Sequence, residues 1–90
     1  MPRVRVKLVS LLRDAVDGAH EIMLEVRNGS SLGDAIRQLF SQYPRLGKLV
    51  EELSKRGLDV LFVLNGKETS LNAEIKDGDE IVILPPASGG

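Results

Sequence analysis

The sequence contains no cysteine and no tryptophan, and it has only one histidine, one tyrosine and two phenylalanines. Without cysteine, the chain can form neither disulfides nor thiolate zinc sites, and it has no thiol nucleophile. So few aromatic side chains do not provide the stacking surface of a protein that binds single-stranded nucleic acid. These absences remove several common classes of enzyme and binding protein.

The chain also lacks an excess of either charge and any long apolar run. Its 12 basic and 13 acidic residues give a net charge of −1, which argues against binding driven by nucleic-acid phosphates. No run approaches the roughly 18 apolar residues of a membrane span. Residues 1–7 alternate charged residues with valine, whereas a signal peptide needs an unbroken apolar stretch. We expect a cytoplasmic protein that binds neither nucleic acid nor membrane.

Catalytic and metal-binding constellations are missing as well. His20 has no histidine partner, and the neighbouring Glu51 and Glu52 do not share a helix face. Asp77 and Asp79 bracket a glycine, but two acids are too few for a calcium loop and are typical of a turn. A chain of 90 residues forms one small core with no room for an enclosed cleft. We therefore expect no catalytic residue, no bound metal and no enzyme activity.

Hydrophobic periodicity places the secondary structure. Ser31 is the expected N-cap of the most regular helix, Pro44 ends that helix, and Asn65-Gly66 is a favoured hairpin turn. The patterns predict strands at 3–9 and 20–26, helices at 32–43 and 45–56, and strands at 59–64, 67–69 and 80–84.

This order of elements predicts an α+β fold. The first two strands form an antiparallel pair, and the first and last strands, which are the most apolar, pair in parallel at the centre of a mixed sheet. One main helix and a short second helix cover the sheet, which is the β-grasp arrangement. We expect one domain at residues 1–84, followed by a flexible tail at residues 85–90.

The last residues are Pro85-Pro86-Ala87-Ser88-Gly89-Gly90. Glycine contributes no side chain to a core and loses the most conformational freedom on ordering, so this pair does little for the fold. It suits a tail that enters a narrow active site. The two prolines direct the base of the tail outward in an extended conformation. Taken alone, the two glycines would also fit an ordinary frayed terminus.

Residues 77–90 resemble the C-terminal signature of the small sulfur-carrier proteins of the ubiquitin-like superfamily. The likeness is to the small subunit of molybdopterin synthase and to the small archaeal modifier proteins. Leu11-Leu12-Arg13-Asp14 and Asn65 also match positions that this family tends to share. The resemblance spans nearly the whole chain but is specific only in its last segment.

The resemblance implies a function for Gly90. Its carboxylate, ionised at neutral pH, would attack ATP in a separate activating enzyme and form an acyl-adenylate. Sulfur transfer would give a thiocarboxylate, which the large subunit of molybdopterin synthase would consume. Gly89 and Gly90 would fit a channel that grips both sides of the backbone, where any Cβ would clash, and Ser88 would belong to the same tail. The carrier itself would bind no cofactor.

Two alternatives remain open within the same family. A protein modifier would be joined through Gly90 to lysines of target proteins, and nothing in the chain separates this use from sulfur transfer. A thiazole-pathway sulfur carrier also ends in Gly-Gly but is usually shorter, so the segment at residues 45–56 counts against it.

Strand parity predicts where partners dock. Val9 falls on the charged face of the first strand, and Val82 and Leu84 face outward if Ile81 and Ile83 face the helix. Parallel pairing would then bring Val9 beside Leu84 in an exposed apolar patch near the tail. Arg5 and Lys7 would rim this patch. The alternative is that these residues are strand formers that loops partly cover.

Overall fold

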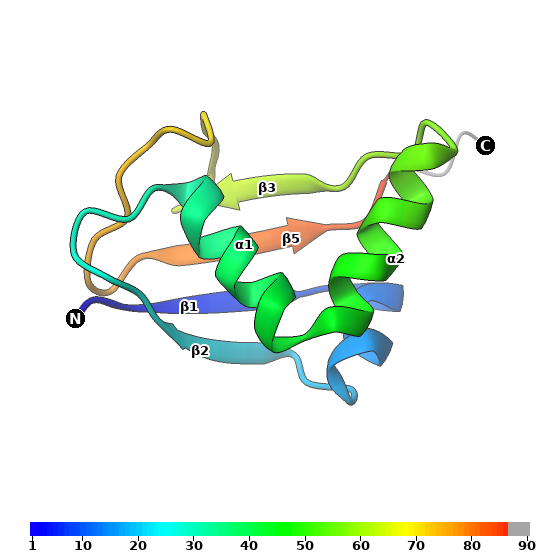
Figure 1. The fold of residues 1–90 in the computed structure, drawn as a ribbon, viewed down its shortest axis with the longest axis horizontal. Coiled ribbons are helices and arrows are strands. Elements are labelled where there is room, and N and C mark those ends of the chain that lie inside the picture. The colour runs from blue at the N-terminus through cyan, green and yellow to red at the C-terminus, as the bar shows by residue number, and fades with distance from the viewer. Residues whose placement is uncertain (87–90) are drawn as a thin grey trace.

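The structure is a computed structural model that describes residues 1–86, and its sheet runs in the order β2-β1-β5-β3-β4. Figure 1 shows the two α-helices crossing one face of this sheet. In chain order the elements are β1 (Arg3–Leu8), the 3-10 helix η1 (Ser10–Val16), β2 (Glu21–Glu25), α1 (Leu32–Gln42), α2 (Pro44–Lys55), β3 (Leu61–Leu64), β4 (Lys67–Glu68) and β5 (Glu80–Leu84). No helix in this part of the chain is long and apolar enough to cross a membrane.

Strand pairing confirms the predicted fold. β1 pairs in parallel with β5, where Val6 lies opposite Ile81 and Leu8 opposite Ile83. β2 joins β1 on the other side in antiparallel orientation, and β3 pairs antiparallel with β5. The chain reaches β3 from β2 by a crossover that contains both α-helices. This is the α+β, β-grasp arrangement.

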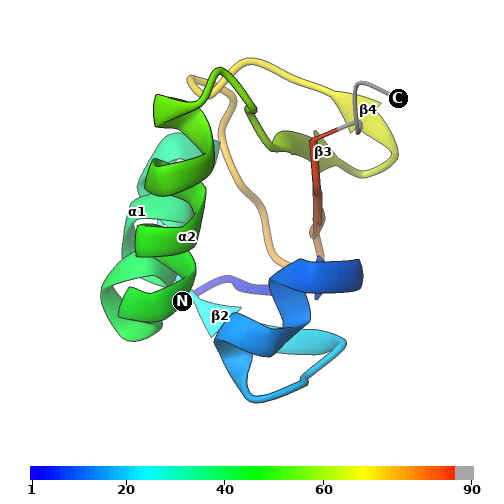
Figure 2. The same ribbon diagram turned by 90° about the vertical axis from the view of Figure 1, so that its right-hand side faces the viewer.

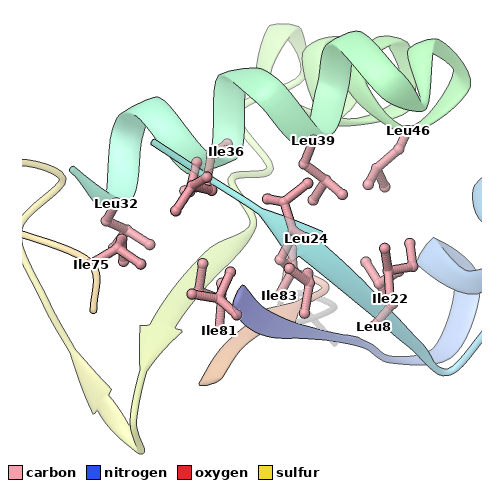
Figure 3. Close-up of a cluster of buried hydrophobic side chains, with 14 of the residues drawn as sticks. Leu8, Ile22, Leu24, Leu32, Ile36, Leu39, Leu46, Ile75, Ile81 and Ile83 are labelled. Carbon is pink, nitrogen blue, oxygen red and sulfur yellow. The ribbon is translucent and has the colours of Figure 1, made fainter. Parts of the chain in front are cut away.

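Figure 2 shows the two α-helices on one side of the sheet, and the buried hydrophobic side chains of these elements form one core cluster. Alternation along β1 and β5 sends every second side chain toward the helices. In Figure 3, Leu39 of α1 and Leu46 of α2 point toward the sheet, where Leu24 and Ile83 meet them. All four side chains are at most 1% exposed. The core therefore fixes which sheet face is left for partners.

The helix boundaries follow from their caps. Ser31 begins α1 with a capping box, because its hydroxyl accepts from the Asp34 amide at 3.1 Å and the Asp34 carboxylate accepts from the Ser31 amide at 3.0 Å. The prediction of a short second helix is wrong: α2 has 12 residues and α1 has 11. Pro44 not only stops α1 but also occupies the first turn of α2, where its missing N–H is not needed.

The connection between β1 and β2 contains a 3-10 helix that the sequence patterns did not predict. Leu12 and Val16 anchor η1 in the core, and Asp17 ends it in the left-handed region at φ 58°. β1 stops at Leu8 instead of the expected Val9, because Ser10, also at φ 58°, turns the chain into η1. Val9 itself remains extended.

Candidate docking face and carrier tail

The sheet face opposite the helices carries an apolar patch. Val82 lies opposite Val63, and Leu84 lies opposite Leu61, so all four side chains fall on this outer face. Val9 follows the Leu8–Ile83 pair and therefore lies at the same end of the sheet as Leu84. We call Val9, Leu61, Val63, Val82 and Leu84 the outer patch.

The structure brings together the three apolar residues that the sequence singled out. Val9 is 39% exposed, while Val82 and Leu84 are half-buried. Val9 is therefore the most accessible of these three residues. That partners dock here stays a prediction.

Sequence reasoning missed the contribution of β3 to the patch. Leu61 is 38% exposed and Val63 is half-buried, whereas their neighbour Leu64 is buried. Residues 60–64 are all apolar, so their composition alone does not show which side chains face the core. Side chains alternate between the two faces of a strand, and the Asn65-Gly66 hairpin fixes the end of this strand. Counting back from the hairpin would have placed Leu61 and Val63 on the outer face.

The predicted rim residues are exposed and lie in a row of ion pairs across the sheet. Lys7 Nζ is 3.1 Å from a Glu80 carboxylate oxygen, and Arg5 is 3.9 Å from the same oxygen and 3.8 Å from Glu21. Such exposed pairs contribute about 0–1 kcal/mol each to stability. A partner that replaces these ion pairs with its own contacts would therefore lose little free energy. Arg5 and Lys7 are thus available for contacts beside the outer patch.

β5 ends at Leu84, as predicted, and Pro85 and Pro86 follow it outside any strand. Both prolines are half-buried. The remaining predicted site residues, Ser88, Gly89 and Gly90, lie outside the described residues. Within the fold, the structure places the base of the tail at the same end of the sheet as Val9.

Asn65 fixes the opposite end of β5. It adopts φ 50° and Gly66 adopts φ 82°, as the predicted hairpin turn requires. The Asn65 side chain donates to Asp79 at 3.0 Å and accepts from the Glu80 amide at 2.9 Å. Its role in this structure is therefore to join the β3–β4 turn to the start of β5.

The two acids around Gly78 serve the turn. The Asp77 carboxylate accepts from the Arg3 amide at 2.8 Å, and the Asp79 carboxylate accepts from the Lys76 amide at 2.8 Å. In residues 1–86, no group of three or more histidine, aspartate or glutamate side chains could hold a metal ion.

A family model described as the ThiS family matches residues 6–90, which is nearly the whole chain. The chain belongs to the ThiS family. Its relatives include proteins named as a molybdopterin synthase sulfur carrier subunit and as small archaeal modifier protein 1. The predicted resemblance is confirmed.

Three similar proteins illustrate the range of the ThiS family. A molybdopterin synthase sulfur carrier subunit of Mycobacterium tuberculosis is 30% identical over 90 residues, which cover 100% of both chains. The solution structure of small archaeal modifier protein 1 from Methanosarcina acetivorans is 33% identical, with a TM-score of 0.79, and covers 100% of this chain and 98% of that one. A protein–protein complex of subunits 1 and 2 of the molybdopterin-converting factor of Helicobacter pylori contains a chain with the same fold, at 22% identity and a TM-score of 0.65, covering 98% and 99%.

Proposed function

We propose that this chain is a cytoplasmic sulfur carrier for the synthesis of the molybdopterin of a molybdenum or tungsten cofactor, with Gly90 as the reacting residue. The observation that carries the proposal is the Pro-Pro-Ala-Ser-Gly-Gly segment directly after β5, at the end of the sheet where Val9 and Leu84 lie. Relatives named sulfur carrier subunits support it. The carrier supplies a substrate group and a docking surface, while other proteins supply catalysis.

The chemistry consists of two substitutions at the Gly90 carboxylate. In a separate activating enzyme, a carboxylate oxygen attacks the α-phosphorus of ATP, pyrophosphate leaves, and an acyl-adenylate forms. Hydrosulfide, which carries sulfur at the sulfide level, then attacks the carbonyl carbon, AMP leaves, and loss of the sulfur-bound proton gives the thiocarboxylate. ATP is bound by the activating enzyme and not by this chain.

The outer patch is the proposed docking surface for these partners. Its half-buried aliphatic side chains with an ion-paired rim match the anatomy of a small interface, with an apolar centre and a polar edge. The H. pylori relative is described as a complex of two converting-factor subunits. We propose that the large subunit of molybdopterin synthase takes the corresponding place here.

The second candidate is a protein modifier joined through Gly90 to lysines of target proteins. The relatives named small archaeal modifier proteins favour it, one of them at 33% identity. Both functions begin with the same acyl-adenylate of Gly90. They differ in the group that attacks it, which is a sulfur donor for the carrier and a target lysine for the modifier. Affinity capture from cells separates them: isopeptide-linked Gly90 on lysines of other proteins identifies a modifier, and a stable non-covalent enzyme partner identifies a carrier.

Deletion of Gly90 tests the proposal. Incubation with the activating enzyme, ATP and a sulfur donor should thiolate the full chain and leave the shortened chain unmodified. The midpoint of thermal unfolding should be the same for both, because Gly90 contributes no side chain to the core. Ser88→Ala keeps the length of the tail and serves as the control. If the shortened chain is still thiolated, the proposal is wrong.

A further inference from the structure

The helix side of the molecule has an apolar groove that is separate from the outer patch. It has a volume of about 370 Å³ and lies between α1, α2 and β3. Ile36 and Phe40 form one wall, Val50 another, and Val60 and Phe62 the floor toward the sheet. Phe40, Val50, Val60 and Phe62 are only half-buried, so the described chain leaves this apolar surface partly open.

The groove has two different ends. Gly33 and Leu71 line the end at the start of α1, where Leu71 is 52% exposed. Ser54 and Asp59 line the end near the C-terminus of α2. In Figure 1 the start of α1 and the end of α2 lie toward opposite sides of the view.

The charge of the groove is unbalanced. Arg37 is the one cationic side chain among its lining residues, and this guanidinium is already ion-paired with Asp34. Asp59 has no ion-pair partner within 4.0 Å in residues 1–86. An occupant that contacts the groove therefore meets apolar walls and one uncompensated carboxylate, which is complementary to a cation.

Strand pairing places the Asp59 end of the groove near the base of the tail. Leu61 opens β3 and pairs with Leu84, the last residue of β5, so Asp59 and Pro85 extend from adjacent strand ends. The groove lies on the helix side of the sheet, and the outer patch lies on the other side. A protein bound to the outer patch would leave the groove free.

We propose that this groove binds a segment of a partner protein in which two apolar side chains are followed by a lysine or arginine. The apolar side chains occupy the space from Leu71 along Phe40 to Val50, and the cation pairs with Asp59. The chain then has two separate docking faces. The lysine or arginine of the bound segment lies at the Asp59 end of the groove, near the base of the tail. This proposal does not depend on the chemistry at Gly90.

A selection of short random peptides displayed on phage against the intact chain tests the proposal. We expect enrichment of sequences with two apolar residues and a lysine or arginine. Amide shifts of the labelled protein should change at Phe40, Val60 and Phe62 when a selected peptide is added. The proposal would be overturned if the enriched peptides lacked a basic residue, if the amide shifts were confined to the outer patch, or if no peptide were enriched.

Exposed residues allow matched variants that preserve the fold. Leu71→Ser should weaken the selected peptide about fivefold or more through lost apolar contact. Asp59→Asn should weaken it about two- to fivefold, and replacing the peptide's basic residue should then have no further effect. Val9→Ser on the outer patch is the control and should not change the affinity. Additive effects of Asp59→Asn and loss of the peptide's basic residue would overturn the proposed ion pair.

The same variants test occupancy by a second copy of the chain. Light scattering should show a monomer at concentrations where the selected peptide saturates the groove. A dimer that Leu71→Ser dissociates would assign the groove to self-association and overturn the proposal.

Discussion

At the scale of single residues, Asn65 joins two parts of the sheet that are far apart in sequence. It holds a left-handed backbone conformation at φ 50° and makes two side-chain hydrogen bonds to residues 79 and 80. Asparagine tolerates this conformation better than most residues, because its short amide can bond to nearby backbone groups. The resemblance to the sulfur carriers at this position is therefore explained by the fold and requires no catalytic role.

Replacing Asn65 separates backbone conformation from hydrogen bonding. Asn65→Ala should lower the free energy of unfolding by about 2–3 kcal/mol, since it adds left-handed strain and removes both bonds. Asn65→Gly removes only the bonds and should cost about 1–2 kcal/mol. Urea unfolding followed by circular dichroism measures both values. Equal losses for the two variants would show that strain contributes nothing.

Asp34 makes helix α1 sensitive to acid. Hydrogen bonds from the backbone amide and the hydroxyl of Ser31 lower the pKa of Asp34, desolvation opposes this effect, and Arg37 adds to the lowering. A carboxyl group whose pKa is lower in the folded state stabilises that state above its ordinary pKa. The contribution is lost as the pH falls through the lowered value.

Asp34→Asn should therefore be less stable than the natural chain at neutral pH. The difference in free energy of unfolding should shrink as the pH is lowered through the range in which Asp34 takes up its proton. Urea unfolding at a series of pH values measures this difference. A difference that stays constant down to the most acidic pH would contradict the assignment.

At the scale of elements, the contact between α1 and α2 depends on Gly47. A Cβ atom at this position would lie 3.0 Å from Cβ and 3.2 Å from Cγ of Phe40. The Cβ of Phe40 is fixed to the backbone of α1, so the two helices would have to move apart. Glycine thus allows the close approach that forms one side of the groove.

Gly47→Ala has two opposing effects on stability: it raises helix propensity and it crowds Phe40. Alanine gains about 1 kcal/mol of propensity within a helix, but overpacking costs about 1–3 kcal/mol. We expect a net loss of about 1 kcal/mol in the free energy of unfolding. The neighbouring Lys48→Ala is exposed and should change it by no more than about 0.5 kcal/mol. A Gly47→Ala variant more stable than the natural chain would show that the contact with Phe40 relaxes at no cost in free energy.

The elements that the sequence predicts well are those with a strong local period. Period-2 alternation identified β1 and β2, and the stripe from Leu32 to Tyr43 identified α1. η1 was not predicted, because a 3-10 helix of 7 residues anchored by Leu12 and Val16 is too short to reveal a period. The outer patch was predicted in part, since the role of Leu61 depends on pairing between strands that are distant in sequence.

At the scale of the whole molecule, the sheet separates two surfaces. The outer patch occupies the face away from the helices, the groove occupies the helix side, and β5 lies in the sheet between them. Two separate surfaces fit the proposed carrier, which would bind different enzymes in turn.

Val9→Asp tests the outer patch as the docking surface. Val9 is exposed, so stability should change by no more than about 0.5 kcal/mol. A charge in the apolar centre should weaken binding to the activating enzyme about tenfold or more. Isothermal titration calorimetry measures the affinity. Met23→Ser alters another exposed apolar residue on the same face, in β2, and should bind normally; equal losses in both variants would argue against a localised patch.

The most direct test of the central claim is the intact mass of the chain after reaction. The protein is incubated with the activating enzyme of its host, ATP and a sulfur donor, and is then analysed by mass spectrometry with fragmentation of its C-terminal peptide. The proposed function predicts a mass gain equal to the replacement of one oxygen by one sulfur, located on Gly90. An unchanged mass, or sulfur bound at any other residue, would contradict it.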